Sequence, residues 1–223
     1  MIAFPGPASA LVTLPVAPDR DGIARVLRLE RFARETLPGL RATIPAFNRL
    51  LVEGTPSLWD PSEVGARLET GARAALEGEP EAPSAALVTL PVCYDGELAP
   101  DLEDVAAIAG LTPDDVARVH SGTTYMVLAT GFAPGFAYLG DLDARIAAPR
   151  LASPRASVPR GSVGIADRRT GVYPADGPGG WCLVGRVPSP FFEDAAERIA
   201  RFTAGGSAEF RRIGRKDYEA ECR

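Results

Sequence analysis

Four arginines give this sequence its strongest candidate for binding an anionic substrate. Arg145, Arg150, Arg155 and Arg160 follow one another closely in a chain whose formal net charge is −5. Prolines between them hold the backbone extended, so the guanidinium groups stand on a stiff ribbon. Guanidinium groups bind carboxylate and phosphate through paired hydrogen bonds. The segment therefore predicts an anion-binding surface, with a solvated face of no special function as the alternative.

The one histidine of the chain, His120, is the best candidate for a proton carrier. An imidazole changes charge near neutral pH, so a small shift of its pKa suits it to general acid–base chemistry. His120 also falls at the end of a predicted helix, where a histidine often caps the last turn and interacts with the helix dipole. The sequence leaves the catalytic role and the capping role open.

Glycine, proline and aromatic residues are interleaved in the segment GFAPGFAYLG (131–140), which follows the apolar run 125–129. Glycine weakens a strand interior, and proline cannot donate to the strand ladder. A strand therefore ends near residue 130 and a shaped loop begins. The aromatic side chains of this loop form either part of the core or the wall of a pocket. A second glycine-rich stretch, 177–180, is either a simple turn or a nest of backbone amides that binds an anion.

Motifs of the common nucleotide-binding and hydrolytic sites are absent from the sequence. It contains no P-loop, no G-x-G-x-x-G, no G-x-S-x-G and no H-E-x-x-H. If the protein handles a nucleotide, it does so without these devices or on a partner. Three scattered cysteines, Cys93, Cys182 and Cys222, argue against a disulfide framework. With a single histidine beside them, no metal site is expected.

The composition argues against two classes of partner. The isoelectric point is near 5.1, and neither nucleic acid nor an anionic membrane would attract an acidic surface. The first residues lack the basic region of a signal peptide, and no apolar stretch approaches the roughly 20 residues of a membrane span. A cytoplasmic location is therefore expected.

Residues 1–80 predict a small α+β domain, in which two helices pack on one face of a small sheet. The evidence is apolar periodicity bounded by cap residues. The predicted elements are a strand at 10–16, a helix at 21–37, short strands at 42–44 and 50–52, and a helix that begins after Asp60 and ends near Gly78. The charged, proline-bearing stretch 77–84 is the best linker candidate.

Residues 85–223 predict a mainly β domain, because short runs of β-prone residues alternate with loops rich in glycine and proline. A compact barrel is the natural closure for such strands, since it removes exposed sheet edges. The predicted elements are a strand at 86–94, helices at 101–109 and 112–120, and strands at 124–130, 162–166, 171–173, 181–187 and 208–213.

The order of these motifs resembles a known family. The motifs are H-S-G at 120–122, G-F-A-P-G-F-x-Y-L-G-x-L-D at 131–143, A-x-P-R-x-x-x-P-R-x-x-V-P-x-G-S-V-G-I-A at 147–166, T-G-x-Y-P at 170–174 and P-G-G-W-x-L-x-G-R at 178–186. They resemble the B-subunit family of bacterial ATP-dependent 5-oxoprolinase, also called the allophanate hydrolase subunit 1 family, which includes sporulation-kinase inhibitors. The resemblance implies a cyclophilin-like β-barrel behind a small α+β domain.

The resemblance also implies a function. Members work beside a homologous C subunit, together with a hydrolase A subunit, and the complex opens 5-oxoproline to L-glutamate with hydrolysis of ATP. We therefore expect a hydrolase that acts on a cyclic amide, uses ATP with Mg²⁺ and shares its active site with the homologous C subunit. The family leaves two alternatives, an inhibitor that binds a sensor histidine kinase and a carboxyltransferase subunit of urea degradation. The last ranks lower, because the chain has no biotin-attachment Met-Lys-Met.

Two residues are the expected catalytic groups within this resemblance. His120 would carry a proton or donate a hydrogen bond, and Arg155, or Arg160 in its place, would hold the substrate carboxylate or a phosphate. The expected substrate-binding residues are Tyr125, Phe132, Pro134, Gly135, Phe136, Arg160, Ser162, Tyr173, Gly179, Gly180 and Trp181.

Overall fold

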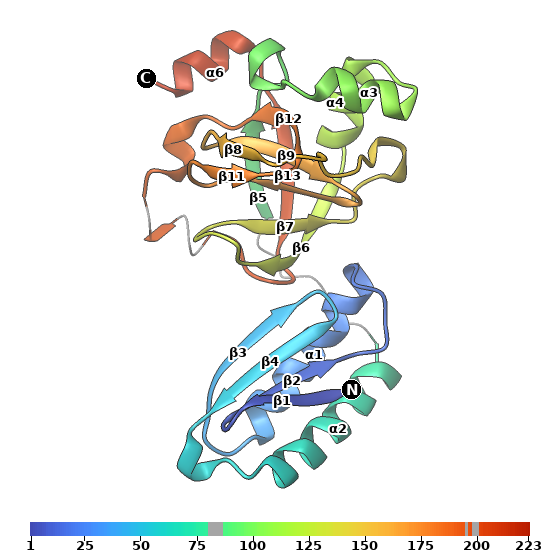
Figure 1. Cartoon of the computed structure of the whole chain (residues 1–223), viewed down its shortest axis with the longest axis vertical. Helices are drawn as coiled ribbons and strands as arrows, with labels where there is room; N and C mark the ends of the chain where they lie inside the picture. The colour runs from blue at the N-terminus through green and yellow to red at the C-terminus, as the bar shows by residue number, and fades with distance from the viewer. Residues whose placement is uncertain (80–86, 195, 198–200) are drawn as a thin grey trace. The chain divides into compact units, whose positions relative to one another are not determined.

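A computed structural model describes residues 1–79, 87–194, 196–197 and 201–223 (Figure 1). The chain divides into two compact units, Met1–Pro83 and Ser84–Arg223, each with its own hydrophobic core. Most of the predicted linker at 77–84 lies outside the described residues. No helix in the described ranges is long and apolar enough to cross a membrane.

Unit 1 is a four-stranded antiparallel sheet in the order β1-β2-β4-β3, with two helices packed against it (Figure 1). Helix α1 packs on β3 and β4, and helix α2 packs on β1 and β2. The elements are β1 (Ile2–Gly6), β2 (Ser9–Thr13), α1 (Arg20–Thr36), β3 (Leu40–Ala46), β4 (Arg49–Gly54), a 3₁₀ turn η1 (Pro56–Leu58) and α2 (Pro61–Glu77).

Local sequence signals explain where both helices of unit 1 begin. The Asp19 carboxylate accepts a hydrogen bond from the Gly22 amide (3.1 Å). At α2, Asp60 accepts from the Ser62 amide (2.9 Å), and Pro61 occupies the first helical position. The predicted helices are confirmed to within a residue or two at each end. Strand β1 was not predicted; its proline is tolerated because β1 is an edge strand.

Unit 2 contains the larger sheet. Its strands are β5 (Leu87–Val92), β6 (Thr124–Thr130), β7 (Ala137–Gly140), β8 (Arg155–Val158), β9 (Ser162–Ala166), β10 (Arg169–Val172), β11 (Gly177–Gly179), β12 (Cys182–Arg186) and β13 (Ser207–Arg212). Its helices are α3 (Leu102–Ala109), α4 (Pro113–Ser121) and α6 (Arg215–Glu221), with 3₁₀ turns η2 (Gly96–Leu98), η3 (Ala144–Ile146) and η4 (Ser189–Phe192).

Seven of these strands form one nearly closed, barrel-like sheet in the order β12-β9-β10-β7-β6-β13-β5. Its two edge strands meet where Cys93, just after β5, bridges Arg186 at the end of β12. Each residue donates its backbone amide to the other's carbonyl, at 3.0 and 2.9 Å. Such pairing removes the exposed edges expected of an open sheet, which confirms the predicted barrel-like closure.

A two-stranded ribbon, β8 paired with β11, stands beside this sheet. The sequence predicted neither strand of the ribbon, nor β7, nor α6. The strands have only three or four residues, too few to display a two-residue period. Helix α6 is short and has no buried residue, so it lacks an apolar face that could be recognised.

Candidate functional site

The loop between β6 and β7 forms a small cavity of about 360 Å³. The amide of Gly131 donates to the Phe136 carbonyl (3.1 Å), and the Phe136 amide donates to Ala133 (2.9 Å), so the loop closes on itself. Gly131 and Gly135 have φ values of 137° and 91°, which glycine adopts without steric cost. The predicted residues Phe132, Pro134, Gly135 and Phe136 line this cavity together with Thr130, Gly131, Ala133 and Phe202.

Phe132 is the exposed member of this loop. Its side chain is 64% exposed, and its φ of +76° is an uncommon backbone conformation for a residue with a Cβ. Its ring meets Phe136 edge-on at 5.4 Å and Tyr173 at 6.3 Å between centroids. The fold therefore holds a large apolar ring in solvent at the cost of local strain.

The other aromatic residues of the predicted pocket wall form a compact cluster. Phe136 contacts Tyr173 at 5.7 Å and Trp181 at 5.6 Å between ring centroids, both in edge-to-face geometry. All three side chains are buried. Both interpretations of these aromatics thus hold in part: Phe136, Tyr173 and Trp181 form a core, and Phe132 stands on its surface.

Arg155 lies at the start of β8, opposite Gly179 of β11. Its Nη2 donates to Asp101 Oδ1 at 2.6 Å. Asp101 is itself fixed to β12, because its Oδ2 accepts from the Leu183 amide (2.6 Å) and its own amide donates to the Leu183 carbonyl (2.9 Å). The Arg155 side chain is 31% exposed, and its Nη1 has no hydrogen-bond partner in the described residues. Asp101 therefore orients the guanidinium group of a side chain that is partly exposed, while its buried Nη1 has no acceptor in the described residues.

Tyr173 connects the aromatic cavity with Arg155. A Cβ on Gly179 would lie 2.4 Å from the Tyr173 hydroxyl, so this close approach requires glycine. Burial raises the pKa of Tyr173, and the positive charges of Arg150 and Arg155 act in the opposite direction. The phenol is therefore neutral at physiological pH and lies within the electrostatic reach of both guanidinium groups.

The glycine-rich stretch at 177–180 adopts neither of its predicted forms. Gly177–Gly179 is the extended strand β11, paired with β8, and none of its glycines has positive φ. A nest of amides needs alternating right- and left-handed backbone conformations, so the predicted anion nest is wrong here. Gly180 instead offers its carbonyl to the Leu151 amide (2.8 Å).

His120 lies in the core of unit 2 with no exposed surface. Its Nδ1 is 2.7 Å from the Tyr94 hydroxyl, and its Nε2 is 2.8 Å from Thr170 Oγ1. Burial lowers its pKa to about 3, so the ring is neutral near pH 7. This environment gives a substrate no route to the ring, and a neutral ring is not a charged partner for the helix dipole. The structure therefore favours a core histidine over both roles considered from the sequence.

Two further predicted substrate-binding residues, Tyr125 and Ser162, are also buried in the core. Tyr125 is buried and donates its hydroxyl to the His120 carbonyl (2.9 Å). Ser162 is also buried, and its Oγ has no partner among the described residues. Neither side chain reaches the surface, so we assign them to the core and not to a substrate pocket.

Arg160 is separated from Arg155 by the length of β8. Its amide donates to Asp176 Oδ1 (2.7 Å), and its side chain lines a different cleft. The structure thus divides the predicted arginine surface into two places. The residue that sequence reasoning missed is Asp101: its place at the start of a predicted helix was visible, but its pairing with Arg155 across 54 residues was not.

The chain resembles known proteins over most of its length. Residues 2–202 match the family model of the carboxyltransferase domain, subdomain C and D. A Bacillus subtilis (strain 168) protein named as the B subunit of 5-oxoprolinase is 41% identical over 199 residues, covering 83% of this chain and 81% of that protein. An Escherichia coli O157:H7 protein of the same name is 37% identical over 191 residues, covering 84% and 86%.

Two solved structures resemble the whole fold. The crystal structure of TTHA0988 superposes with a TM-score of 0.72 and 29% identity, over 96% of this chain and 40% of that one. The K. lactis urea amidolyase superposes with a TM-score of 0.76 over 98% of this chain and 15% of that one. Its identity is 19%, so this likeness concerns the fold alone. The chain therefore spans less than half of either structure.

Proposed function

Because this chain belongs to the B-subunit family of 5-oxoprolinase and carries its carboxyltransferase domain, subdomain C and D, we propose that it is a subunit of an ATP-dependent 5-oxoprolinase. The complex opens 5-oxoproline to L-glutamate, and it is completed by two partners, a homologous C subunit plus a hydrolase A subunit. The barrel of unit 2 is of the cyclophilin-like type, and the enzyme works in the cytoplasm. The observation that carries this proposal is the 41% identity across 83% of the chain.

The substrate carboxylate binds at Arg155. Asp101 holds one edge of the guanidinium group, and Nη1 remains without an acceptor in the described part of the chain. A substrate carboxylate would meet the exposed part of the Arg155 side chain, where the positive charge of the guanidinium group favours a charge-assisted hydrogen bond. Phe132 and its cavity cover the apolar edge of the lactam ring, and the Tyr173 ring lies edge-on to Phe132 at 6.3 Å between centroids.

The chemistry that this site serves is activation of an amide. The lactam oxygen takes the terminal phosphoryl group of ATP, and the bond to ADP breaks. Water then adds to the activated carbon and the C–N bond opens to give an acyl phosphate, which a second water converts to glutamate and phosphate. Such transfers depend mainly on positioning and on positive charge near the oxygens, which Arg150 and Arg155 supply.

We infer that this chain shares the reaction centre with its partner subunits. Within the described ranges, no group of three His, Cys, Asp or Glu side chains could hold a metal ion. Mg²⁺ that accompanies ATP is usually held by one or two carboxylates together with the phosphates, so an ATP–Mg²⁺ site does not require such a group. ATP with Mg²⁺ binds on the partner subunits or at a site shared with them.

The test is reconstitution. The chain is co-expressed with its two partners, the A and C subunits, and release of glutamate and phosphate from 5-oxoproline and ATP is measured. A complex lacking this chain is the control. Equal amounts of both products, absent from the control, support the proposal. A well-assembled but inactive complex contradicts it.

A second function has one observation in its favour, the match to a carboxyltransferase domain. In that case the assembled complex would transfer a carboxyl group from biotin to an amide of the urea type. The same complex, supplied with carboxylated biotin and urea, distinguishes the two reactions. If the chain binds no C subunit at all, an inhibitor that binds a sensor histidine kinase becomes the better hypothesis.

A further inference from the structure

Unit 2 has a second cleft, of about 480 Å³, on the opposite end of β8 from Arg155. A cleft of this size is within the range that holds small molecules. Its polar lining comes from four separate segments: the turn before β9, the turn before β11, the end of β12 with η4, and helix α6. The residues that matter for its chemistry are Arg160, Asp176, Arg186, Ser189 and Tyr218.

The turn that carries Arg160 is fixed by its backbone. Gly161 has a φ of +81°, its amide donates to the Tyr173 carbonyl (2.7 Å), and its carbonyl accepts from the Val187 amide (2.8 Å). A Cβ at Gly161 would lie 2.2 Å from the Val187 carbonyl oxygen. Together with the bond from the Arg160 amide to Asp176, these contacts hold the turn against the end of β12.

Arg186 is held equally firmly from the other side. Its amide and carbonyl both pair with Cys93, which is the bridge that nearly closes the barrel. Its Nε is buried and has no hydrogen-bond partner within the described part of the chain. Among the described residues, no carboxylate forms an ion pair with either Arg160 or Arg186. The cleft therefore presents two guanidinium groups without an ion-pair partner in the described residues, with the Asp176 carboxylate in the same lining and Glu97 within the electrostatic reach of Arg186.

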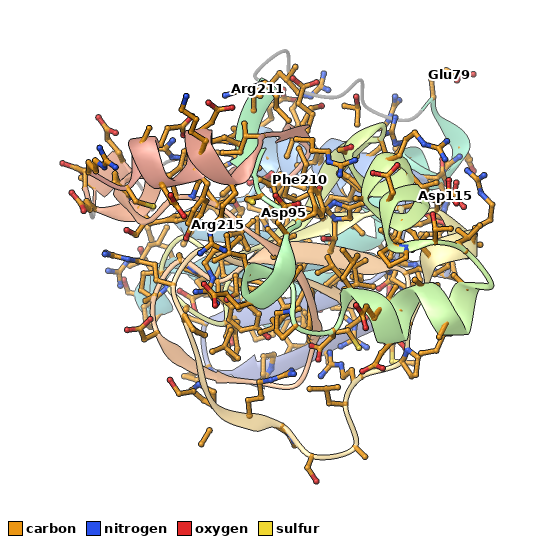
Figure 2. All side chains as sticks on the ribbon, turned by 90° about the horizontal axis from the view of Figure 1, so that it is seen from above. Glu79, Asp95, Asp115, Phe210, Arg211 and Arg215 are labelled. Carbon is orange, nitrogen blue, oxygen red and sulfur yellow. The ribbon has the colours of Figure 1, made fainter. Side chains whose placement is uncertain are left out.

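Helix α6 forms the far wall of the cleft through Tyr218. The helix is anchored by Arg215 at its first turn, which donates to Glu97 (2.7 Å) and to Glu219 (2.7 Å). Figure 2 shows Arg215 on this helix and Asp95 in the segment that follows β5. A third arginine near the cleft is thus already paired, which leaves Arg160 and Arg186 as the free cations among the described residues that line it.

We propose that this cleft binds the phosphate group of a small molecule between Arg160 and Arg186. Two guanidinium groups match the charge of a phosphate dianion better than that of a single carboxylate. The Ser189 hydroxyl can donate to a remaining oxygen, and Tyr218, whose side chain interacts with Cys222, forms the wall of the cleft beside it. The Asp176 carboxylate also lines the cleft, where it accepts a hydrogen bond from the Arg160 amide. Its negative charge repels a phosphate. The inference does not depend on the proposed function, since Arg155 takes no part in it.

The test is calorimetric titration of the purified chain with inorganic phosphate and, separately, with ATP. The variants are Arg160→Gln and Arg186→Gln, with Arg118→Gln as the control, since Arg118 is an exposed arginine of α4 in the same unit. We expect each cleft variant to weaken binding about tenfold or more, because each removes charge-assisted hydrogen bonds to the phosphate oxygens. The control should bind as the parent does. Tighter binding of ATP than of phosphate identifies a nucleotide, and equal binding identifies the phosphate group alone.

A further variant gives the opposite sign. Asp176→Asn keeps an oxygen that can accept from the Arg160 amide but removes the negative charge, so phosphate should bind more tightly. Failure of the parent to bind either probe overturns the proposal, and so does an equal loss of affinity in all three arginine variants. Thermal unfolding of each variant shows whether the fold is intact. These outcomes are read without any glutamate assay, so they are independent of the 5-oxoprolinase proposal.

Discussion

The Tyr94 hydroxyl and His120 Nδ1 lie 2.7 Å apart in the core of unit 2. Together with Thr170, this contact fixes the tautomer of the imidazole ring. Thr170 Oγ1 donates its single proton to the Gly164 carbonyl (2.9 Å), so it can only accept from His120 Nε2. The ring is therefore protonated on Nε2, and its Nδ1 accepts from Tyr94. The Phe210 ring lies 4.4 Å from it, centroid to centroid, and completes a packed environment.

This network predicts that His120→Ala acts on stability. The substitution leaves a cavity and removes the partners of Tyr94 and Thr170, so we expect the free energy of unfolding to fall by about 3–5 kcal/mol. Tyr94→Phe removes only one hydroxyl and should cost about 1–2 kcal/mol. Urea unfolding of both variants measures these values. If the His120→Ala variant is as stable as the parent but has lost catalysis, His120 has a catalytic role and the core assignment is wrong.

The depressed pKa of His120 predicts a pH dependence of stability. The folded value is about 3 and the ordinary value is 6.5, so below pH 6.5 the unfolded chain binds a proton that the folded chain does not. Stability is therefore fully present above pH 6.5 and declines as the pH falls toward 3, by at most about 1.4 kcal/mol per pH unit.

Urea unfolding at several pH values from 7 to 5 measures how the free energy of unfolding changes with pH. Most carboxylates titrate below this window. Because His120 is the only histidine, the His120→Gln variant serves as the control and should lose the slope in that window. A parent protein whose stability is constant from pH 7 to 5 contradicts the buried, neutral histidine.

The sequence signals that worked are those contained within a few residues. Thr112 and Asp115 form the capping box that their spacing indicates, with the Asp115 amide donating to Thr112 Oγ1 at 3.1 Å. Gly110 ends α3 in the left-handed conformation that a terminal glycine favours. Such contacts depend on neighbours in the chain, so they can be read before the fold is known.

The contacts that decide function join distant residues, and this is why the site was predicted less well than the fold. His120 meets Tyr94 across 26 residues and Thr170 across 50. A lone histidine at a helix end gives no sign of those partners. Arg155 and Arg160 are near neighbours in sequence, yet Arg155 begins β8 and Arg160 lies in the turn beyond the other end of that strand. The arginine and proline pattern at 145–160 predicted an anion-binding site. It did not show that these arginines are divided between two sites.

Arg155 supports a prediction about catalysis in the assembled enzyme. Arg155→Gln removes the charge that faces the substrate carboxylate, and we expect kcat/KM for 5-oxoproline to fall roughly 10- to 100-fold. Arg145→Gln, which alters an exposed pair with Asp143, should leave kcat/KM unchanged. Steady-state kinetics on both complexes provides the comparison, and full activity of the Arg155 variant would remove it from the site.

Asp101 is a positioning residue, and its variant should behave differently. Asp101→Asn keeps acceptor capacity toward the Leu183 amide but weakens the hold on Arg155. We expect KM to rise more than kcat falls, because the guanidinium group is misplaced and not removed. A loss of stability with unchanged KM would show that Asp101 serves only the fold.

The Arg160 turn gives a prediction with a matched control. Gly161→Ala places a Cβ 2.2 Å from the Val187 carbonyl at a φ of +81°, so we expect a loss of about 2–3 kcal/mol in the free energy of unfolding. Gly177→Ala meets no atom within 4 Å and has no positive φ, so it should be nearly neutral. Chemical unfolding of the two variants compares them directly, and equal stabilities would show that the turn is not held as described.

Phe132 allows binding to be separated from stability. Its ring is 64% exposed and its backbone is strained at a φ of +76°, so Phe132→Gly should leave stability within about 1 kcal/mol of the parent, and the relieved strain can raise it. Phe136→Ala removes a ring that is 2% exposed and should cost about 3–5 kcal/mol. If Phe132 covers the substrate, its glycine variant keeps the fold but shows a raised KM in the reconstituted complex. If instead KM is unchanged and assembly with the C subunit is weakened, the strained ring serves the interface with that partner and the lactam binds elsewhere.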